Sequence, residues 1–151
     1  MGLKRQRDLA VVVAAVSIVL LVSAVLLFSV RIRNVGRIKA VGIEVFGDAG
    51  CSVVLRSVDW GLLAPGDLAG TTVYVKNVKN SAVNLTFAVE NWDPAGAGAY
   101  LFFDVNYTEG FVLQPGDVLA VLFSLFVDPG IEGVNQFSFD IVVTAREVPL
   151  S

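Results

Sequence analysis

From residue 40 onward the sequence is built of short segments in which apolar and polar residues alternate, and none shows helical spacing. The alternation is clearest at 83–90, where every second position is apolar. A period of two is typical of a strand with one face on a core and the other toward water. We therefore expect seven strands, at 41–45, 53–58, 71–77, 83–90, 101–107, 118–127 and 137–143.

The segments between these strands are rich in Gly, Pro, Asp and Asn, which are the residues that form turns. Many short strands joined by such turns, without helices between them, are typical of a sandwich of two sheets. The sequence therefore predicts an all-β domain over 40–145, a seven-stranded antiparallel immunoglobulin-like β-sandwich.

Two of the turns share one pattern, LAPGDL and LQPGDV, placed fifty residues apart. Pro65 and Pro115 fix φ near −65°, and Gly66 and Gly116 can supply the positive φ of the next turn position. Each pattern predicts a tight corner that leads into a long strand. The similarity does not extend beyond six residues, which favours recurrent turn chemistry over a duplicated domain.

The predicted strand at 118–127, VLAVLFSLFV, differs from the others because it is apolar at nearly every position. A strand that is covered on both sides has this composition, so we expect it to be central and doubly buried. The alternative is a strand whose second face packs against another subunit, because exposed apolar patches mark interfaces.

An uncharged apolar run covers residues 9–30. As a helix it would be about 33 Å long, which matches a hydrocarbon core of about 30 Å. We expect a transmembrane helix that anchors the chain in the lipid bilayer, with residues 1–8 as a cytoplasmic tail, 31–39 as a basic juxtamembrane linker and 146–151 as a C-terminal tail. The alternative is a signal peptide cleaved after the small residues at 22–24, which would release a secreted binding module.

Charge divides the chain into two parts. Residues 1–39 hold seven basic residues and one acidic one, whereas residues 40–151 hold four basic and thirteen acidic. The acidic part argues against nucleic-acid binding. Basic residues flank both ends of the apolar run, so charge does not set its orientation. Asn84 and Asn106 begin N-glycosylation motifs and lie on the polar phase of their strands, which favours an extracytoplasmic domain.

The residue inventory disfavours catalysis. The chain has no histidine and one cysteine, which excludes histidine-based catalytic triads and an internal disulfide. We expect no enzyme activity, no cofactor and no metal. The acidic residues of the predicted loops do carry carboxylate oxygens, which are the ligands that calcium prefers. Cys51 is expected to be a small buried residue or a free thiol. Trp60 and Trp92 are expected to cap the core, or alternatively to offer a carbohydrate a flat surface.

The stretch SVDWGLLAPGDLAGTTVYVKN at 57–77 resembles the opening of small archaeal membrane-anchored immunoglobulin-like proteins, most of them uncharacterised. The similarity continues in ENWDP at 90–94 and FSFDI at 137–141, so it covers about 57–145. The resemblance implies a scaffold and a location at the cell surface, and it brings no catalytic residue with it.

These observations predict a non-catalytic single-pass membrane protein with its C-terminal domain outside the cell. Its expected roles are adhesion, envelope structure or an accessory subunit of a membrane complex, through a protein partner or self-association. The alternative is a filament subunit similar to archaeal pilins and archaellins, in which the apolar helix packs into the filament. Arg7 and Asp8 stand where the processing site of those subunits normally has a small residue after Lys or Arg.

Overall fold

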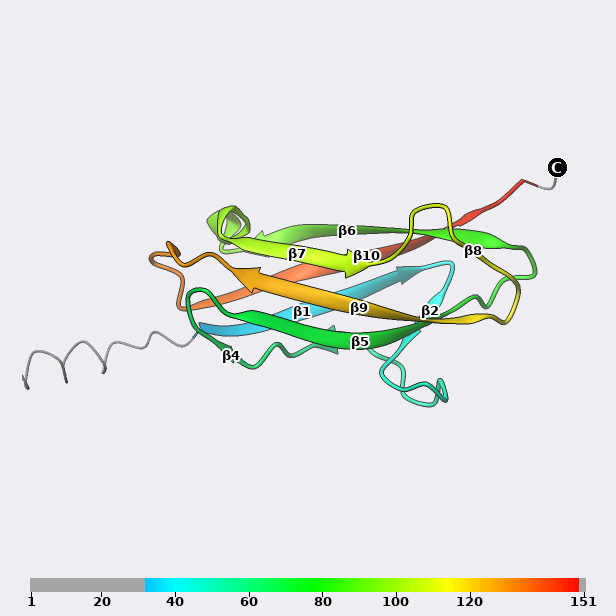
Figure 1. Ribbon diagram of the computed structural model, residues 1–151, viewed down its shortest axis with the longest axis horizontal. Helices are drawn as coiled ribbons and strands as arrows, with labels where there is room; N and C mark the ends of the chain where they lie inside the picture. The colour runs from blue at the N-terminus through cyan, green and yellow to red at the C-terminus, as the bar shows by residue number, and fades with distance from the viewer. Residues whose placement is uncertain (1–31, 150–151) are drawn as a thin grey trace, which may run out of the picture. The chain divides into compact units, whose positions relative to one another are not determined.

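The computed structural model describes residues 32–149, and nearly all of their regular structure is strand (Figure 1). The strands are β1 (Ile32–Val41), β2 (Glu44–Phe46), β3 (Ser57–Val58), β4 (Leu62–Leu63), β5 (Leu68–Lys76), β6 (Val83–Asp93), β7 (Leu101–Asn106), β8 (Val112–Leu113), β9 (Val118–Val127) and β10 (Gln136–Glu147). One 3₁₀ turn, η1 (Ala95–Ala99), precedes β7. The prediction of an all-β fold is confirmed for this part of the chain.

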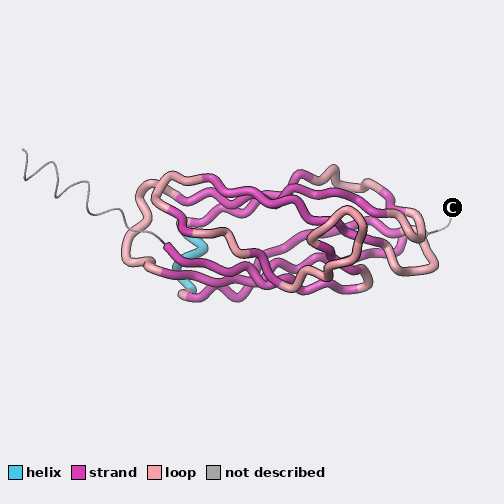
Figure 2. The backbone as a smooth tube through the Cα atoms, turned by 90° about the horizontal axis from the view of Figure 1, so that it is seen from below, coloured by secondary structure: helices cyan, strands magenta, loops and turns pink. Residues whose placement is uncertain are grey.

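The strands form two sheets that pack face to face, as the edge-on view in Figure 2 shows. The first sheet has the order β3-β1-β10-β6-β8, with β4 also paired to β1, and the second has the order β2-β5-β9-β7. Inward residues of both sheets make one core, in which Val73, Phe123, Phe139 and Ile141 have no exposed surface. The two-layer arrangement agrees with the predicted sandwich.

The predicted count of seven antiparallel strands is wrong. The described residues form ten strands, and β1 runs parallel to β10, with Ile38 opposite Ile141. Two of the additional strands, β4 and β8, have two residues each, which is too short for alternation to reveal. The parallel pair is non-local, so no pattern within either strand could indicate it.

The sandwich begins at Ile32, so residues 32–39 are part of β1 and not a linker. The basic composition concealed the strand. Arg37 and Lys39 are exposed on the outer face, whereas the inner face carries the small or polar residues Asn34 and Gly36 between two isoleucines. At the other end β10 continues to Glu147, two residues into the predicted C-terminal tail.

The predicted strands at 41–45 and 53–58 are also corrected. Gly42 has φ of +75° and ends β1, so that β2 begins separately at Glu44 and joins the second sheet. Of 53–58 only Ser57 and Val58 form a strand, while Val54 makes an isolated bridge to Phe46.

The prediction that 118–127 is covered on both faces is wrong. β9 is central in its sheet, and its inward residues Val121, Phe123, Leu125 and Val127 are buried. Its outward face has no second layer above it within the described residues, and it exposes three large apolar side chains, of Val118, Leu122 and Phe126.

No helix among residues 32–149 is long and apolar enough to cross a membrane. The predicted transmembrane helix at 9–30 and the tail at 1–8 lie outside the described residues.

Candidate functional site

The outer face of the second sheet carries an apolar row that crosses three strands. Leu68 of β5 lies opposite Phe126 of β9, and Phe126 lies opposite Phe102 of β7. Leu68 is 71% exposed and Phe102 is 52% exposed. The two phenylalanine rings stack with their centroids 6.3 Å apart. Together with Leu122, which lies four residues from Phe126 on the same strand face, we call these residues the outer stripe.

Small residues separate the two parts of the outer stripe. Gly70 and Ser124 lie opposite each other between the row and Leu122. A Cβ atom built on Gly70 would be 3.4 Å from Leu122 Cδ1, so the leucine leans over the glycine. Exposed aromatic and aliphatic side chains held on a rigid sheet are typical of surfaces that bind another protein.

The outer stripe lies at one defined end of the sandwich. Leu63 pairs with Ile32, the first residue of β1, and the chain reaches Leu68 five residues later. Figure 1 shows the start of β1, the tip of β9 and the start of β7 at the same end. The row of three residues is therefore near the point where the described chain begins.

Trp60 and Trp92 lie against one phenylalanine of the core. The rings of Trp60 and Phe139 are nearly parallel with centroids 6.4 Å apart, and those of Trp92 and Phe139 are 4.4 Å apart. Trp60 is buried, so its ring offers no face to a ligand, whereas Trp92 is half-buried. The two residues meet in the core and do not form a shared flat surface for a sugar.

Asn34 and Gly36 of β1 position Trp60, and sequence analysis missed both. The side chain of Asn34 accepts a hydrogen bond from the Trp60 backbone N–H at 3.0 Å and donates one to the Gly61 carbonyl at 3.0 Å. These bonds join β1 to the segment between β3 and β4, where the strand pairing is interrupted. A Cβ on Gly36 would be only 3.0 Å from Trp60 Nε1, so a larger residue there would have to displace the indole.

The two Pro-Gly corners have the same geometry. Gly66 and Gly116 have φ of +87° and +83°. In each corner the backbone N–H of the aspartate donates a 3.0 Å hydrogen bond to the carbonyl of the residue three positions earlier. The carboxylate of the same aspartate accepts a hydrogen bond from the backbone N–H of that earlier residue, at 2.8 Å for Asp67 and 2.9 Å for Asp117. The corners therefore fix the starts of β5 and β9.

Each corner also bonds to the far end of the other strand. Gly66 N–H donates to the Val127 carbonyl at the end of β9, and Gly116 N–H donates to the Asn77 carbonyl just after β5. The two strands are thus clamped at both ends. This reciprocal arrangement holds the surface that carries the outer stripe.

The two asparagines of the glycosylation motifs differ in exposure. Asn106 is exposed at the end of β7, opposite Leu122. Asn84 is half-buried on β6, and its Oδ1 atom is buried without a hydrogen-bond partner. Asn106 is therefore the more accessible acceptor for a glycan.

Two acidic residues of the loops, Asp48 and Asp128, accept hydrogen bonds within turns. Asp48 accepts hydrogen bonds from the backbone N–H groups of Ser52 and Val53, and Asp128 accepts one from Gly130 N–H. The Val53 N–H, followed by the Ser52 hydroxyl, lowers the pKa of Asp48. Within the described ranges no three His, Cys, Asp or Glu residues lie close enough together to hold a metal ion. Cys51 is half-buried, with a free thiol and φ of +51°.

A charged cluster joins three strands of the first sheet. Asp140 of β10 is only 3% exposed, and its carboxylate bonds to Arg37 Nε at 2.8 Å, Lys39 Nζ at 2.7 Å and Asn91 Nδ2 at 2.8 Å. The Asn91 amide, then Lys39 and Arg37, holds the pKa of Asp140 well below its usual range. Asp140 and then Glu90 raise the pKa of Lys39. The cluster fastens β1 to β10 and β6.

No family model matches the chain, and a search of the curated proteins found no match.

Proposed function

We propose that this chain is a non-catalytic, single-pass membrane protein whose immunoglobulin-like sandwich stands outside the cell and binds another protein through the outer stripe. The observation that carries the proposal is the row Leu68, Phe126 and Phe102, which places exposed apolar side chains across three strands. Burying them against a partner would stabilise a complex by about 25 cal/mol per Å² of apolar surface.

Charge supports a foreign partner over a second copy. Residues 32–149 hold seven basic and thirteen acidic residues, a net charge of −6, so two sandwiches repel each other at low ionic strength. Ile32 follows the apolar run 9–30 after a single residue. A predicted span so close in sequence to the sandwich favours a partner in the same membrane, and therefore an accessory subunit of a membrane complex.

The location rests on the sequence. The run at 9–30 has the length and composition of a membrane span, and the motifs at Asn84 and Asn106 favour a domain outside the cell. The similarity of 57–145 to archaeal membrane-anchored immunoglobulin-like proteins supports the same placement and suggests an archaeal source.

The test of location uses intact cells. Protease added outside should digest the epitope-tagged C-terminal domain, and the full chain should need detergent for extraction. N-terminal sequencing should find Met1 or Gly2. A mature start near Asp8 or Leu9 would favour the filament alternative, and a start near Val25 without a detergent requirement would favour a secreted module. An undigested domain in intact cells would refute the proposed location.

The test of the outer stripe compares two variants of the full chain in native membranes. After chemical cross-linking, L68S/F126S should lose a cross-linked partner that the wild type retains. V53S, at a position 59% exposed in a loop away from the stripe, should retain it. Equal cross-linking by all three proteins would refute the outer stripe as the binding surface.

A further inference from the structure

One free strand edge from each sheet borders the same groove. β6 pairs with β10 along its length, but on its other side only Val83 and Asn84 pair, with β8. β7 is the last strand of the second sheet and pairs only with β9. The two edges run next to each other in Figure 1, and residues of both line a groove of about 420 Å³.

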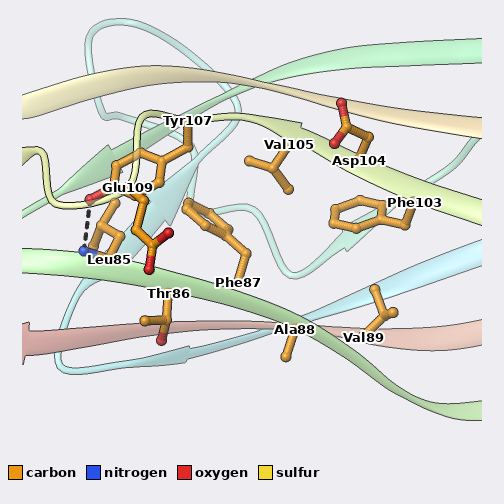
Figure 3. A pocket seen from close by; sticks show the side chains of 10 residues that line it. All are labelled: Leu85, Thr86, Phe87, Ala88, Val89, Phe103, Asp104, Val105, Tyr107 and Glu109. Atoms are coloured by element: carbon orange, nitrogen blue, oxygen red, sulfur yellow. Dashed lines mark hydrogen bonds between the residues drawn. The ribbon is translucent and has the colours of Figure 1, made fainter.

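The direction of the β6 backbone follows from one hydrogen bond, drawn as the dashed line in Figure 3. Leu85 N–H donates to the Tyr107 hydroxyl at 3.0 Å, so the backbone of Leu85 faces away from β10. In an antiparallel pair, successive residues face alternate sides. Phe87 and Val89 therefore also turn their N–H and C=O groups toward the groove, where no described strand pairs with them.

The same reasoning orients β7. The backbone N–H and C=O groups of Val127 bond to the corner before β5. Those of the preceding residue, Phe126, therefore face the opposite side, toward its partner Phe102 on β7. Phe103 and Val105 consequently face the groove. This edge is already partly satisfied, because the Val105 carbonyl accepts the Tyr107 N–H at 2.8 Å. The edge of β6 is the more open of the two.

The floor of the groove is apolar and its rim is acidic. The side chains of the same edge residues, Leu85, Phe87, Val89, Phe103 and Val105, line it, as Figure 3 shows. Glu109 lines the groove at the Tyr107 end, and within the described residues its carboxylate makes no ion pair. A backbone edge over an apolar floor suits an extended polypeptide, and the free carboxylate suits a basic side chain on it.

We propose that this groove accepts an extended segment of a partner protein, which pairs antiparallel with β6 at Phe87 and Val89, beyond the Leu85 N–H that Tyr107 already occupies. Every second side chain of the segment is apolar and enters the groove, and a Lys or Arg lies beside Glu109. A foreign segment fits better than a second copy, because the sandwich is acidic overall. The site is separate from the outer stripe, which lies on the outer face of the second sheet.

The test uses the full chain in detergent and fluorescent nine-residue peptides that alternate valine with threonine and carry one terminal lysine. The β6 residues whose side chains enter the groove also direct their backbone N–H and C=O groups toward it. In an antiparallel pair the opposite residue of the peptide shares that side-chain direction, so the valines that enter the groove are also the residues whose amides bond to β6. Methylating the valine amides should weaken binding about tenfold or more, whereas methylating the threonine amides should leave most of it. This comparison needs no change to the protein.

Two protein variants complete the test. E109K should weaken binding of the lysine peptide roughly twofold to fivefold, as expected for one exposed ion pair, and should favour a glutamate-bearing peptide. E132K, which changes an exposed acidic residue that does not line the groove, should bind as the wild type does. Hydrogen exchange measured with bound peptide should slow in the segment that contains Phe87 and Val89.

Four outcomes would overturn the proposal: no binding at millimolar peptide, equal sensitivity to both methylation patterns, protection confined to the outer stripe, or protection of β6 by self-association without peptide. Because L68S/F126S should bind peptide normally, failure of the groove and failure of the outer stripe are distinguishable.

Discussion

The carboxylate of Asp140 accepts a 2.8 Å hydrogen bond from the side-chain amide of Asn91 on the neighbouring strand. Asn91 has φ of +54° and, with Trp92, occupies a bulge in which two residues of β6 oppose Phe139 alone. The bulge turns the amide toward the carboxylate and also places the Trp92 ring against Phe139. One local irregularity thus links the charged cluster outside the sheet to the aromatic core inside it.

Replacing Asp140 tests this link. D140N keeps the shape of the side chain but removes the charge that Arg37, Lys39 and Asn91 bind, so the free energy of unfolding should fall by about 1–3 kcal/mol at pH 7. D104N changes an exposed aspartate without an ion pair in the described residues, and its effect should stay within about 0.5 kcal/mol. Urea denaturation measures both, and equal losses would contradict the prediction.

The same residue predicts a pH dependence. The pKa of Asp140 is lower in the folded protein than its ordinary value of 3.8, so the unfolded state takes up the proton first as pH falls. The stabilisation is complete well above pH 3.8 and is lost progressively below it. The difference between wild type and D140N should therefore be constant from pH 7 to 5 and shrink below pH 3.8. A difference that grows in acid would contradict this assignment.

A leucine-to-alanine substitution should lower the stability of the protein much more on the inner face of the second sheet than on its outer face. L125A removes a fully buried side chain of β9 and should cost about 2–5 kcal/mol. L68A acts in the outer stripe on an exposed side chain and should change stability by less than about 0.5 kcal/mol. Thermal unfolding of the full chain in detergent separates the two, and a comparable loss in L68A would mean that the stripe is covered within the same molecule.

The two corners should be equivalent. Alanine at Gly66 or Gly116 must adopt a φ near +85°, which costs a non-glycine residue about 1–2 kcal/mol. G96A is a matched control, because Gly96 has no positive φ and an added Cβ meets nothing within 4 Å. We expect similar losses for G66A and G116A and almost none for G96A. A difference above about 1 kcal/mol between the two corner variants would contradict their equivalence.

Glycan occupancy tests the proposed location. In protein purified from its native membrane, mass spectrometry should find a glycan on Asn106, which is exposed, more often than on Asn84, whose Oδ1 is buried. N106Q should remove most of the added mass. Complete absence of glycan in a source that glycosylates its other surface proteins would contradict an extracytoplasmic domain.

The sequence predicted the elements that have a local signature. The strands at 71–77, 83–90 and 101–107 appear close to their expected bounds because their alternation reports burial on one face. The corners at Pro65 and Pro115 follow from residues within four positions of each other. The structure did not test the predicted membrane segment or the cell-surface location.

Other features of the protein were decided only by the tertiary structure, because they depend on residues that are far apart in the sequence. β1 was hidden because its inward positions hold Asn34 and Gly36, which make sense only with Trp60 packed beside them. The outer stripe could not be recognised because an apolar strand looks the same whether its second face is covered or open. Local pattern fixes which residues can form a strand, whereas pairing and coverage are set by contacts between segments far apart in the chain, and these contacts decide which apolar side chains remain available to a partner.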